Sequence, residues 1–283
     1  MGTLFLVATP IGHLEDVTLR ALRVLREAGL VLAEDTRRTR ILLDRHAIAA
    51  RPISLHAHNE AARIERVLAV LEAGGSAALV SDAGTPLVSD PGERLVAAAI
   101  AAGHAVVAVP GASAVLAALS VAGLPAERFA FAGFLPRRAR ERDAWLEAWR
   151  ERPETLVLFE SPRRLPATLA RLLAILGDRP ACVARELTKL HEEAARGSLG
   201  ELATRFAKGA RGEVTIVVGG CPRQAAAGAA PDLDAAIRAR LASGETTREI
   251  ASRLAAQCGV PRREVYARAL ALRGKGPPES SPK

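Results

Sequence analysis

Short apolar runs alternate with segments of helical periodicity along the first 110 residues, and this alternation constrains the fold more than any other feature. It predicts strands near 3–9, 30–34, 52–57, 76–81 and 105–109, and helices near 17–28, 36–45, 60–73 and 92–102. Several helices stop at a glycine, the usual C-terminal signal. Strands that alternate with helices pair in parallel, so we expect an α/β sheet covered on both faces.

The chain changes character around 129–150, where a strand gives way to a turn and a very basic helix. A second alternating block predicts strands at 155–160, 181–186 and 213–219 and helices at 164–176 and 199–208. Three helical patterns follow at 232–242, 246–256 and 261–272, with the spacing of a helix-turn-helix. We expect an α/β domain at 1–134, a second at 135–221, a linker at 222–231, a helical C-terminal module at 232–273 and a disordered tail at 274–283.

Polar, glycine-rich loops follow four strands of the first block, at 8–16, 33–40, 81–92 and 109–114. Ligands bind beyond the carboxyl ends of parallel strands, so the four loops together predict a ligand cleft. Neither a P-loop nor the GxGxxG fingerprint is present, which disfavours a nucleoside triphosphate or NAD. Each loop alone has a simpler explanation, because prolines, glycines and N-capping side chains also shape turns.

The loop at 81–92 reads SDAGTPLVSDPG, so it contains nearly the same tetrapeptide twice. The repeat supplies two carboxylates, Asp82 and Asp90, at the end of a buried strand. Eight residues of turn-rich loop fix no distance between them. We expect one carboxylate to contact the ligand and the other to brace the loop.

The net charge is +8, with a pI of about 10.3, which favours a polyanionic partner and nucleic acid first. Of the 39 basic residues four are lysines and 35 are arginines, a bias that a GC-rich genome gives any protein. Three separated cysteines, with no histidine pairs beside them, indicate a reducing cytoplasm and no metal site. Because only 3% of residues are aromatic, an aromatic stacking platform for RNA is not expected.

Six segments, taken in order, closely resemble the ribosomal RNA small subunit methyltransferase I family of the tetrapyrrole methylase superfamily. They are LFLVATPIGHLEDVTLRAL, AEDTRRTRILL, LVSDAGTPLVSDPGERLV, VVAVPGASAVLAAL, GFLPR and LFESPRRL. The resemblance implies two α/β domains with S-adenosylmethionine in the cleft between them. It also implies 2′-O-methylation of a cytidine in the decoding region of 16S rRNA, on a small ribosomal subunit and by a homodimer.

The resemblance also implies which residues face the cofactor. They are Pro10, Gly12, Asp82, Ala83, Gly84, Thr85, Ser113, Ala114, Gly133, Val214 and Thr215. Asp82 is expected to offset the ammonium or sulfonium charge, and the glycines let backbone approach the ligand closely. One departure is His13, where the family usually has asparagine; both side chains donate and accept one hydrogen bond.

A ribose 2′-hydroxyl reacts faster when a positioned group takes its proton. The candidates are Glu160, Glu186 and Lys189 at the ends of second-block strands, although ion pairs Glu160–Arg163 and Glu186–Lys189 would equally explain these residues as braces. Phosphate contacts that position RNA are expected from the arginines. The residues concerned are Arg37, Arg38, Arg40, Arg137, Arg138, Arg163 and Arg263.

Two other functions compete with this interpretation. A C-methyltransferase of tetrapyrrole precursors would need a pocket for an anionic macrocycle but no helix-turn-helix segment. A non-enzymatic regulator would sense a small ligand with its α/β part and bind duplex DNA through 232–272.

Overall fold

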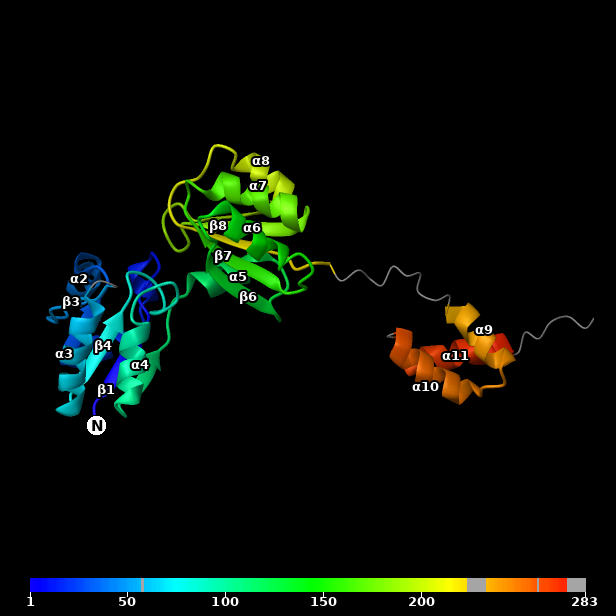
Figure 1. Ribbon diagram of the computed structural model, residues 1–283, viewed down its shortest axis with the longest axis horizontal. Coiled ribbons are helices and arrows are strands. Elements are labelled where there is room, and N and C mark those ends of the chain that lie inside the picture. The colour runs from blue at the N-terminus through cyan, green and yellow to red at the C-terminus, as the bar shows by residue number, and fades with distance from the viewer. Residues whose placement is uncertain (57–58, 223–232, 259, 274–283) are drawn as a thin grey trace, which may run out of the picture. The chain divides into compact units, whose positions relative to one another are not determined.

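The computed structural model describes residues 1–56, 59–222, 233–258 and 260–273. They form two compact units, Met1–Cys221 and Pro222–Lys283 (Figure 1). The expected tail at 274–283 and almost all of the expected linker at 222–231 lie outside the described residues. No helix in the described part of the chain is both long and apolar enough to cross a bilayer.

The first five strands form one parallel sheet, as the sequence predicts, and their order in it is β3-β2-β4-β1-β5. Their bounds are Thr3–Val7 for β1, Leu30–Ala33 for β2, Ile53–Ser54 for β3, Ser76–Val80 for β4 and Ala105–Val109 for β5. β2 and β4 are buried along almost their whole length, which is typical of parallel strands covered on both faces. All five carboxyl ends therefore meet at one edge.

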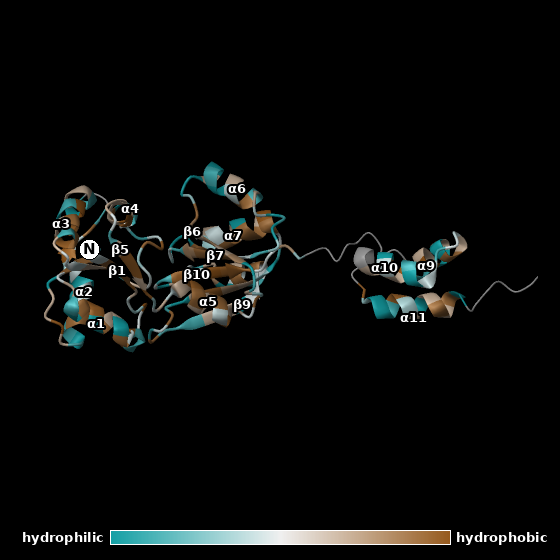
Figure 2. Ribbon diagram, turned by 90° about the horizontal axis from the view of Figure 1, so that it is seen from below, coloured by the Kyte–Doolittle hydropathy of each residue, from teal (hydrophilic) through white to brown (hydrophobic). Residues whose placement is uncertain are grey.

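Two pairs of helices cover the two faces of this sheet (Figure 2). Helices α1 (Leu19–Glu27) and α2 (Thr36–Arg45) bury one apolar stripe against Val7, Val31 and Val80. Helices α3 (Glu60–Glu72) and α4 (Glu93–Ala101) pack on the opposite face against Leu4, Leu32 and Leu79. Alternate residues of each strand thus enter separate cores, as strand geometry requires.

The second sheet has the order β6-β7-β10-β8-β9 and is mostly antiparallel. Only β6 (Phe129–Phe134) and β7 (Thr155–Glu160) pair in parallel. β8 (Pro180–Arg185) and β10 (Val214–Val218) lie where strands are expected, whereas β9 (Glu193–Ser198) has no counterpart in the sequence-based prediction. Because β6 pairs with β7, the two sheets divide before β6, while the expected boundary at residue 134 falls after it.

Four helices cover the second sheet. α6 (Ala139–Glu147), α7 (Leu165–Leu176) and α8 (Leu199–Arg205) enclose one core with its strands. α5 (Ala114–Ala122) follows β5 but packs on the other face of the second sheet, where Val115, Ala118 and Leu119 meet Cys182 and Val217. The loop between β5 and α5 therefore joins the edge of the first sheet to the second.

Three helices make up the described part of the second unit: α9 (Leu233–Ala242), α10 (Thr247–Cys258) and α11 (Arg262–Arg273). They confirm the three helices that the sequence predicts there. Ile237, Ile250, Leu254 and Val265 are almost fully buried in a core of their own. Packing among these three helices therefore does not depend on side chains of the first unit.

Candidate functional site

The loops that follow β1 and β4 are tied together at the carboxyl edge of the first sheet. The Thr9 amide donates to the Gly84 carbonyl at 2.9 Å, and the Gly84 amide donates back to the Thr9 carbonyl at 3.0 Å. The Thr9 hydroxyl donates to the Ser81 carbonyl at 3.1 Å. Gly84 is buried with φ +82°, a backbone conformation that glycine adopts without strain. Gly84 thus fixes the two loops to each other.

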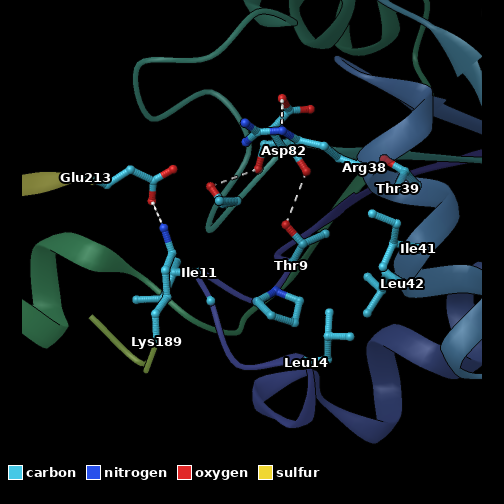
Figure 3. Close-up of a pocket in the computed structure, with 14 residues that line it drawn as sticks. Thr9, Ile11, Leu14, Arg38, Thr39, Ile41, Leu42, Asp82, Lys189 and Glu213 are labelled. Atoms are coloured by element: carbon cyan, nitrogen blue, oxygen red, sulfur yellow. Dashed lines mark hydrogen bonds and ion pairs between the residues drawn. The ribbon is translucent and has the colours of Figure 1, made fainter. Parts of the chain in front are cut away.

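A cavity of about 190 Å³ opens beside this junction, and we call it the Lys189 cavity (Figure 3). Pro10, Gly12 and Asp82 line it on the side of the first sheet, with Arg38 from α2. Figure 3 shows Lys189 and Glu213, from the second half of the unit, facing them. The cavity therefore combines residues of both halves of the first unit.

Gly12 lies at a close approach between the two halves. A Cβ atom there would lie 2.5 Å from Lys189 Cγ, 2.7 Å from Thr188 Oγ1 and 2.9 Å from the Leu187 carbonyl oxygen. The next amide, of His13, donates to Thr188 Oγ1 at 3.0 Å. Gly12 therefore allows the loop to contact residues 187–189 closely, and it also lines the cavity.

A second cavity, of about 350 Å³, lies next to the first, and we call it the Ser113 cavity. The two share Ile11, Ala83 and Glu213 as a common wall. Six of the predicted cofactor residues line the Ser113 cavity: Ala83, Thr85, Ser113, Ala114, Val214 and Thr215. Its volume falls within the usual range for small-molecule sites.

Gly133 lines neither cavity but lies beside the loop at 81–92. It has φ +61° at an irregularity of β6, and a Cβ atom there would lie 3.2 Å from Ser89 Oγ. Phe134 and Phe159, which sequence reasoning missed, form an apolar wall of the Ser113 cavity with ring centroids 5.7 Å apart. Their positions within strand patterns gave no sign that they face a ligand site.

Asp82 braces the loops rather than standing free in a cavity. Its Oδ1 atom accepts the Asp35 amide at 2.8 Å, and Oδ2 lies 3.7 Å from Arg38 Nε. The Asp35 carboxylate is in turn held by Arg37, and these hydrogen bonds lower the pKa of Asp35 to about 2. Asp82 thus joins the end of β4 to the start of α2.

Asp90 lines the Ser113 cavity and is partly buried. Burial, followed by the negative charge of Glu34, raises the pKa of Asp90 to about 6, although a hydrogen bond from Ser81 acts in the opposite direction. Within the described ranges no lysine or arginine forms an ion pair with it. Asp90 therefore lines a cavity without an ion-pair partner among the described residues.

Lys189 is held between two carboxylates. Its Nζ atom lies 2.9 Å from Glu186 Oε1 and 3.1 Å from Glu213 Oε2. Burial works against its charge, but the hydrogen bonds to Glu186 and Glu213 outweigh it and raise the pKa of Lys189. The pKa of Glu186 is lowered, first by the hydrogen bond from the Glu213 amide and then by Lys189. Lys189 therefore carries its proton at neutral pH, and Glu186 is a weak base.

Glu160 lines the Ser113 cavity, but its carboxylate is fully engaged within the protein. The Thr168 hydroxyl donates to Oε2 at 2.6 Å, the Ser161 amide donates to Oε1 at 2.7 Å, and Arg164 Nε lies 3.3 Å away. Only 3% of the residue is exposed. This arrangement fastens the start of α7 to the end of β7. The expected ion pair with Arg163 is formed by Arg164 instead.

The arginines predicted to bind RNA occupy different settings. Arg38 lines the Lys189 cavity, while Arg37 pairs with Asp35 at 2.8 Å and Arg40 with Asp44 at 3.8 Å. Arg138 pairs with Glu141 at 3.0 Å at the start of α6, and Arg137 and Arg163 are exposed. Arg263 belongs to α11 in the second unit.

Two joined sheets of this kind are also found in a known class of enzymes. The crystal structure of uroporphyrin-III C-methyltransferase from Thermus thermophilus is similar, with a TM-score of 0.54 and 25% identity over 78% of this chain and 93% of that one. The family described as Tetrapyrrole (Corrin/Porphyrin) Methylases matches residues 3–203. The chain has the architecture of that class.

Relatives with closer sequences identify the family within the class. The ribosomal RNA small subunit methyltransferase I of Micromonospora olivasterospora is 48% identical over 98% of this chain and 89% of its own length. The protein of the same name from Thermotoga maritima is 46% identical over 221 residues, which are 78% of this chain and 99% of the relative. The chain therefore belongs to the ribosomal RNA small subunit methyltransferase I family.

Proposed function

We propose that this methyltransferase uses S-adenosylmethionine to methylate the 2′-hydroxyl of a cytidine in the decoding region of 16S rRNA, on the cytoplasmic small ribosomal subunit. The observation that carries the proposal is 48% identity over 98% of the chain to a small subunit methyltransferase. The excess of eight positive charges supports a polyanionic substrate.

The Ser113 cavity suits the methyl donor. S-adenosylmethionine combines a flat purine, a ribose and an amino acid, and this cavity combines the rings of Phe134 and Phe159 with hydroxyl groups of Ser113 and Thr215. A few polar groups in a mostly apolar cavity are what small-molecule sites usually offer. We therefore assign the donor to this cavity and the predicted cofactor residues Pro10, Gly12 and Asp82 to its border with the Lys189 cavity.

Asp90 takes the role that the sequence suggested for Asp82. The donor carries a sulfonium and an ammonium, and Asp90 is the carboxylate that lines the Ser113 cavity without a cationic partner among the described residues. Asp82 already accepts the Asp35 amide and lies near Arg38. Of the two repeated aspartates, Asp90 is thus the ligand contact and Asp82 the brace.

The acceptor ribose belongs in the Lys189 cavity, on the other side of the wall formed by Ile11, Ala83 and Glu213. The bound donor supplies an electrophilic methyl group on its sulfonium. This chain must then orient the hydroxyl and remove its proton. Glu213, which lines both cavities, accepts the hydroxyl proton, while Lys189 keeps its own proton and stabilises the negative charge that develops on the oxygen; Glu186 holds the amine in position.

The arginines around the cavities complete the RNA-facing wall. Arg38 lies in the Lys189 cavity, and Arg37, Arg137 and Arg163 are exposed, so their guanidinium groups can bind phosphates. Phosphate contacts fix the register of an RNA without reading its sequence. The target nucleotide would turn out of its stack into the Lys189 cavity.

Methyl transfer to the ribosome tests the proposal directly. The full chain is incubated with labelled S-adenosylmethionine and unmodified small subunits, and the labelled nucleotide is mapped by its resistance to alkaline cleavage, which 2′-O-methylation confers. We expect one labelled cytidine in the decoding region. Label on a base instead of a ribose, or no label on the subunit, would contradict the proposal.

A matched pair of lysine variants tests the role of Lys189. Lys189→Met removes the amine from the cavity, whereas Lys208→Met makes the same change at an exposed position. We expect Lys189→Met to lower kcat about 10²- to 10³-fold, the usual loss when one group that stabilises a developing oxyanion is removed, and Lys208→Met to leave it unchanged. A loss below tenfold in the first variant would contradict this role of Lys189.

A tetrapyrrole substrate is the second candidate, because the similar Thermus thermophilus structure is a uroporphyrin-III C-methyltransferase. The described cavities argue against a macrocycle with many carboxylates, since Lys189 and Arg38 are the only basic residues that line either of them. Uroporphyrinogen III in place of the small subunit therefore serves as the competing substrate. Methylation of it at a rate matching the subunit would favour the second candidate.

A homodimer is part of the proposal. β5 lies at the edge of the first sheet and exposes Ala105 and Ala108. Ile100 (60%) is exposed on α4, which contacts β5, and Leu116 (57%) is exposed on α5, which follows β5 in the chain. An open strand edge with exposed apolar neighbours invites pairing with another chain. We expect a dimer in sedimentation velocity and a monomer for Ile100→Asp; a monomeric parent protein would contradict this.

A further inference from the structure

Three arginines and the only tyrosine of the chain share one hollow on the helical module. Arg248 comes from the first turn of α10, and Arg262, Arg263 and Tyr266 come from the first turns of α11. Tyr266 is 41% exposed, and all three arginines are exposed. We call these four residues the Tyr266 surface.

We propose that the Tyr266 surface is a second RNA contact, in which the arginines bind phosphates and Tyr266 stacks on an unpaired base. The inference rests on the proposed function, which supplies the RNA, but concerns a unit separate from the two cavities. It assigns the helical module to substrate capture instead of chemistry.

Charge in the module is concentrated and unevenly paired. Residues 233–273 contain eight arginines and four acidic residues, an excess of four positive charges, which is half of the +8 of the whole chain. The four acidic residues are engaged elsewhere: Glu245 with Arg240 and Arg253, Glu264 and Asp234 with Arg268, and Glu249 with Thr246.

The arginines of the Tyr266 surface are left without acidic partners. Among the described residues, no ion pair involves Arg248, Arg262 or Arg263. Unneutralised guanidinium groups around one hollow attract phosphate, which they bind in a bidentate manner. The positive ends of the helix dipoles of α10 and α11 add to the same potential, because these arginines lie in the first turns.

One relative of the same family name is too short to contain both units. The Thermotoga maritima relative matches with 99% of its own length over 221 residues, the size of the first unit here. That relative carries the same family name, so a chain about as long as the first unit can belong to the family. A separate core in the module agrees with an accessory role.

RNA is a better occupant than duplex DNA. A helix-turn-helix reads DNA bases with polar side chains in the major groove, whereas three guanidinium groups and one phenol ring suit phosphates and the face of an unpaired base. Small-subunit rRNA presents both. Base stacking on an aromatic side chain typically strengthens binding by about tenfold or more for each base.

The single tyrosine makes the test specific. The full chain is labelled with 3-fluorotyrosine, so that its one ¹⁹F resonance reports on position 266 alone. We expect addition of a 16S rRNA fragment that contains the decoding region to shift or broaden this resonance. Duplex DNA of equal length is the competing probe.

Charge-matched variants separate this surface from general attraction. Arg248→Gln combined with Arg263→Gln removes two charges from the hollow. Arg253→Gln combined with Arg268→Gln removes two charges five positions later on each helix, about 140° around the helix axis. We expect the first pair to lower the salt dependence of rRNA binding by about 1.4 in log–log slope, and the second to change it far less. Tyr266→Ala should weaken binding about tenfold.

Methyl transfer to small subunits distinguishes the failure of this inference from that of the proposed function. The Tyr266-surface variants should raise KM for the subunit at least tenfold and leave kcat unchanged. An unmoved ¹⁹F resonance with rRNA, equal effects of both charge pairs, or tighter binding of duplex DNA would each overturn the inference. If the parent chain methylates no subunit but its resonance still responds to rRNA, the proposed function fails and the RNA surface stands.

Discussion

Replacing Asp90 by asparagine should stabilise the protein and at the same time weaken donor binding. The pKa of Asp90 is raised from 3.8 to about 6, mainly by burial and then by Glu34, so the ionised carboxylate is disfavoured in the folded state. A difference of about two units corresponds to about 3 kcal/mol at neutral pH. Partial exposure of the side chain reduces this to about 1–2 kcal/mol.

The direction of the pH dependence follows from the same shift. The folded state binds the Asp90 proton more tightly than the unfolded state does. This preference contributes to the free energy of unfolding in full below pH 3.8, and the contribution is lost as the pH rises through about 6. The amide that Asp90→Asn introduces does not titrate. The advantage of this substitution is therefore small near pH 4 and complete above pH 7, and about two thirds of it develops between pH 4.5 and 7.5.

Urea unfolding followed by circular dichroism at several pH values measures this advantage. Asp16→Asn, at an exposed position outside both cavities, controls for the loss of one carboxylate. Calorimetry with S-adenosylmethionine supplies the second readout, in which Asp90→Asn should weaken binding about 10- to 100-fold because a charged partner is lost. A pH-independent advantage, a destabilised variant at pH 7.5, or unchanged donor affinity would refute the reasoning.

Three further substitutions test how the walls are built. Gly12→Ala places a methyl group 2.5 Å from Lys189 Cγ and should lower the free energy of unfolding by about 1–3 kcal/mol in urea titration. Glu160→Ala leaves the Thr168 hydroxyl without its acceptor and should lower the free energy of unfolding by about 2–4 kcal/mol in the same assay. An unchanged stability would contradict the bracing role of Glu160. Ser89→Gly relieves a φ of +70° and should raise stability by about 0.5–1 kcal/mol, and a loss would show that the hydroxyl is needed.

The sequence predicts most elements of the first unit because their patterns agree with their burial. Every strand of the first sheet and the helices α1 to α4 lie where apolar runs and periodicity place them, and β7 matches its predicted range of 155–160. The parallel order then follows, and with it the convergence of four loops at one edge. Local pattern and tertiary packing point to the same structure there.

Two elements were missed because their local sequence is uninformative. β9 reads EAARGS, which has little strand propensity, and only pairing with β8 makes it a strand. α5 is apolar almost all round, so it shows no periodicity that would distinguish it from a buried strand. Its covering of the second sheet is a tertiary fact, as is the antiparallel direction of β10.

The roles of the two repeated aspartates depend on contacts that lie far apart in the sequence. SDAG and SDPG look alike, and both place a carboxylate after a strand. The Asp35 amide, 47 residues away, engages Asp82, whereas the hydrogen bond that Asp90 receives comes from Ser81 in the same loop. A loop's composition can therefore predict a candidate ligand site, but which aspartate braces the loop depends on contacts with neighbouring segments.

Backbone strain is concentrated in the two loops that flank the cavities. Leu87 and Ser89 in one loop, and Glu186 and Thr188 in the other, have φ between +50° and +73°, which is costly for residues other than glycine. Surrounding hydrogen bonds hold this geometry, such as that from the His13 amide to Thr188. Methyl transfer requires reacting atoms held about 3–3.5 Å apart, and walls that are already fixed lose little entropy on binding. The strain therefore lies where the proposed site for two substrates needs a fixed geometry.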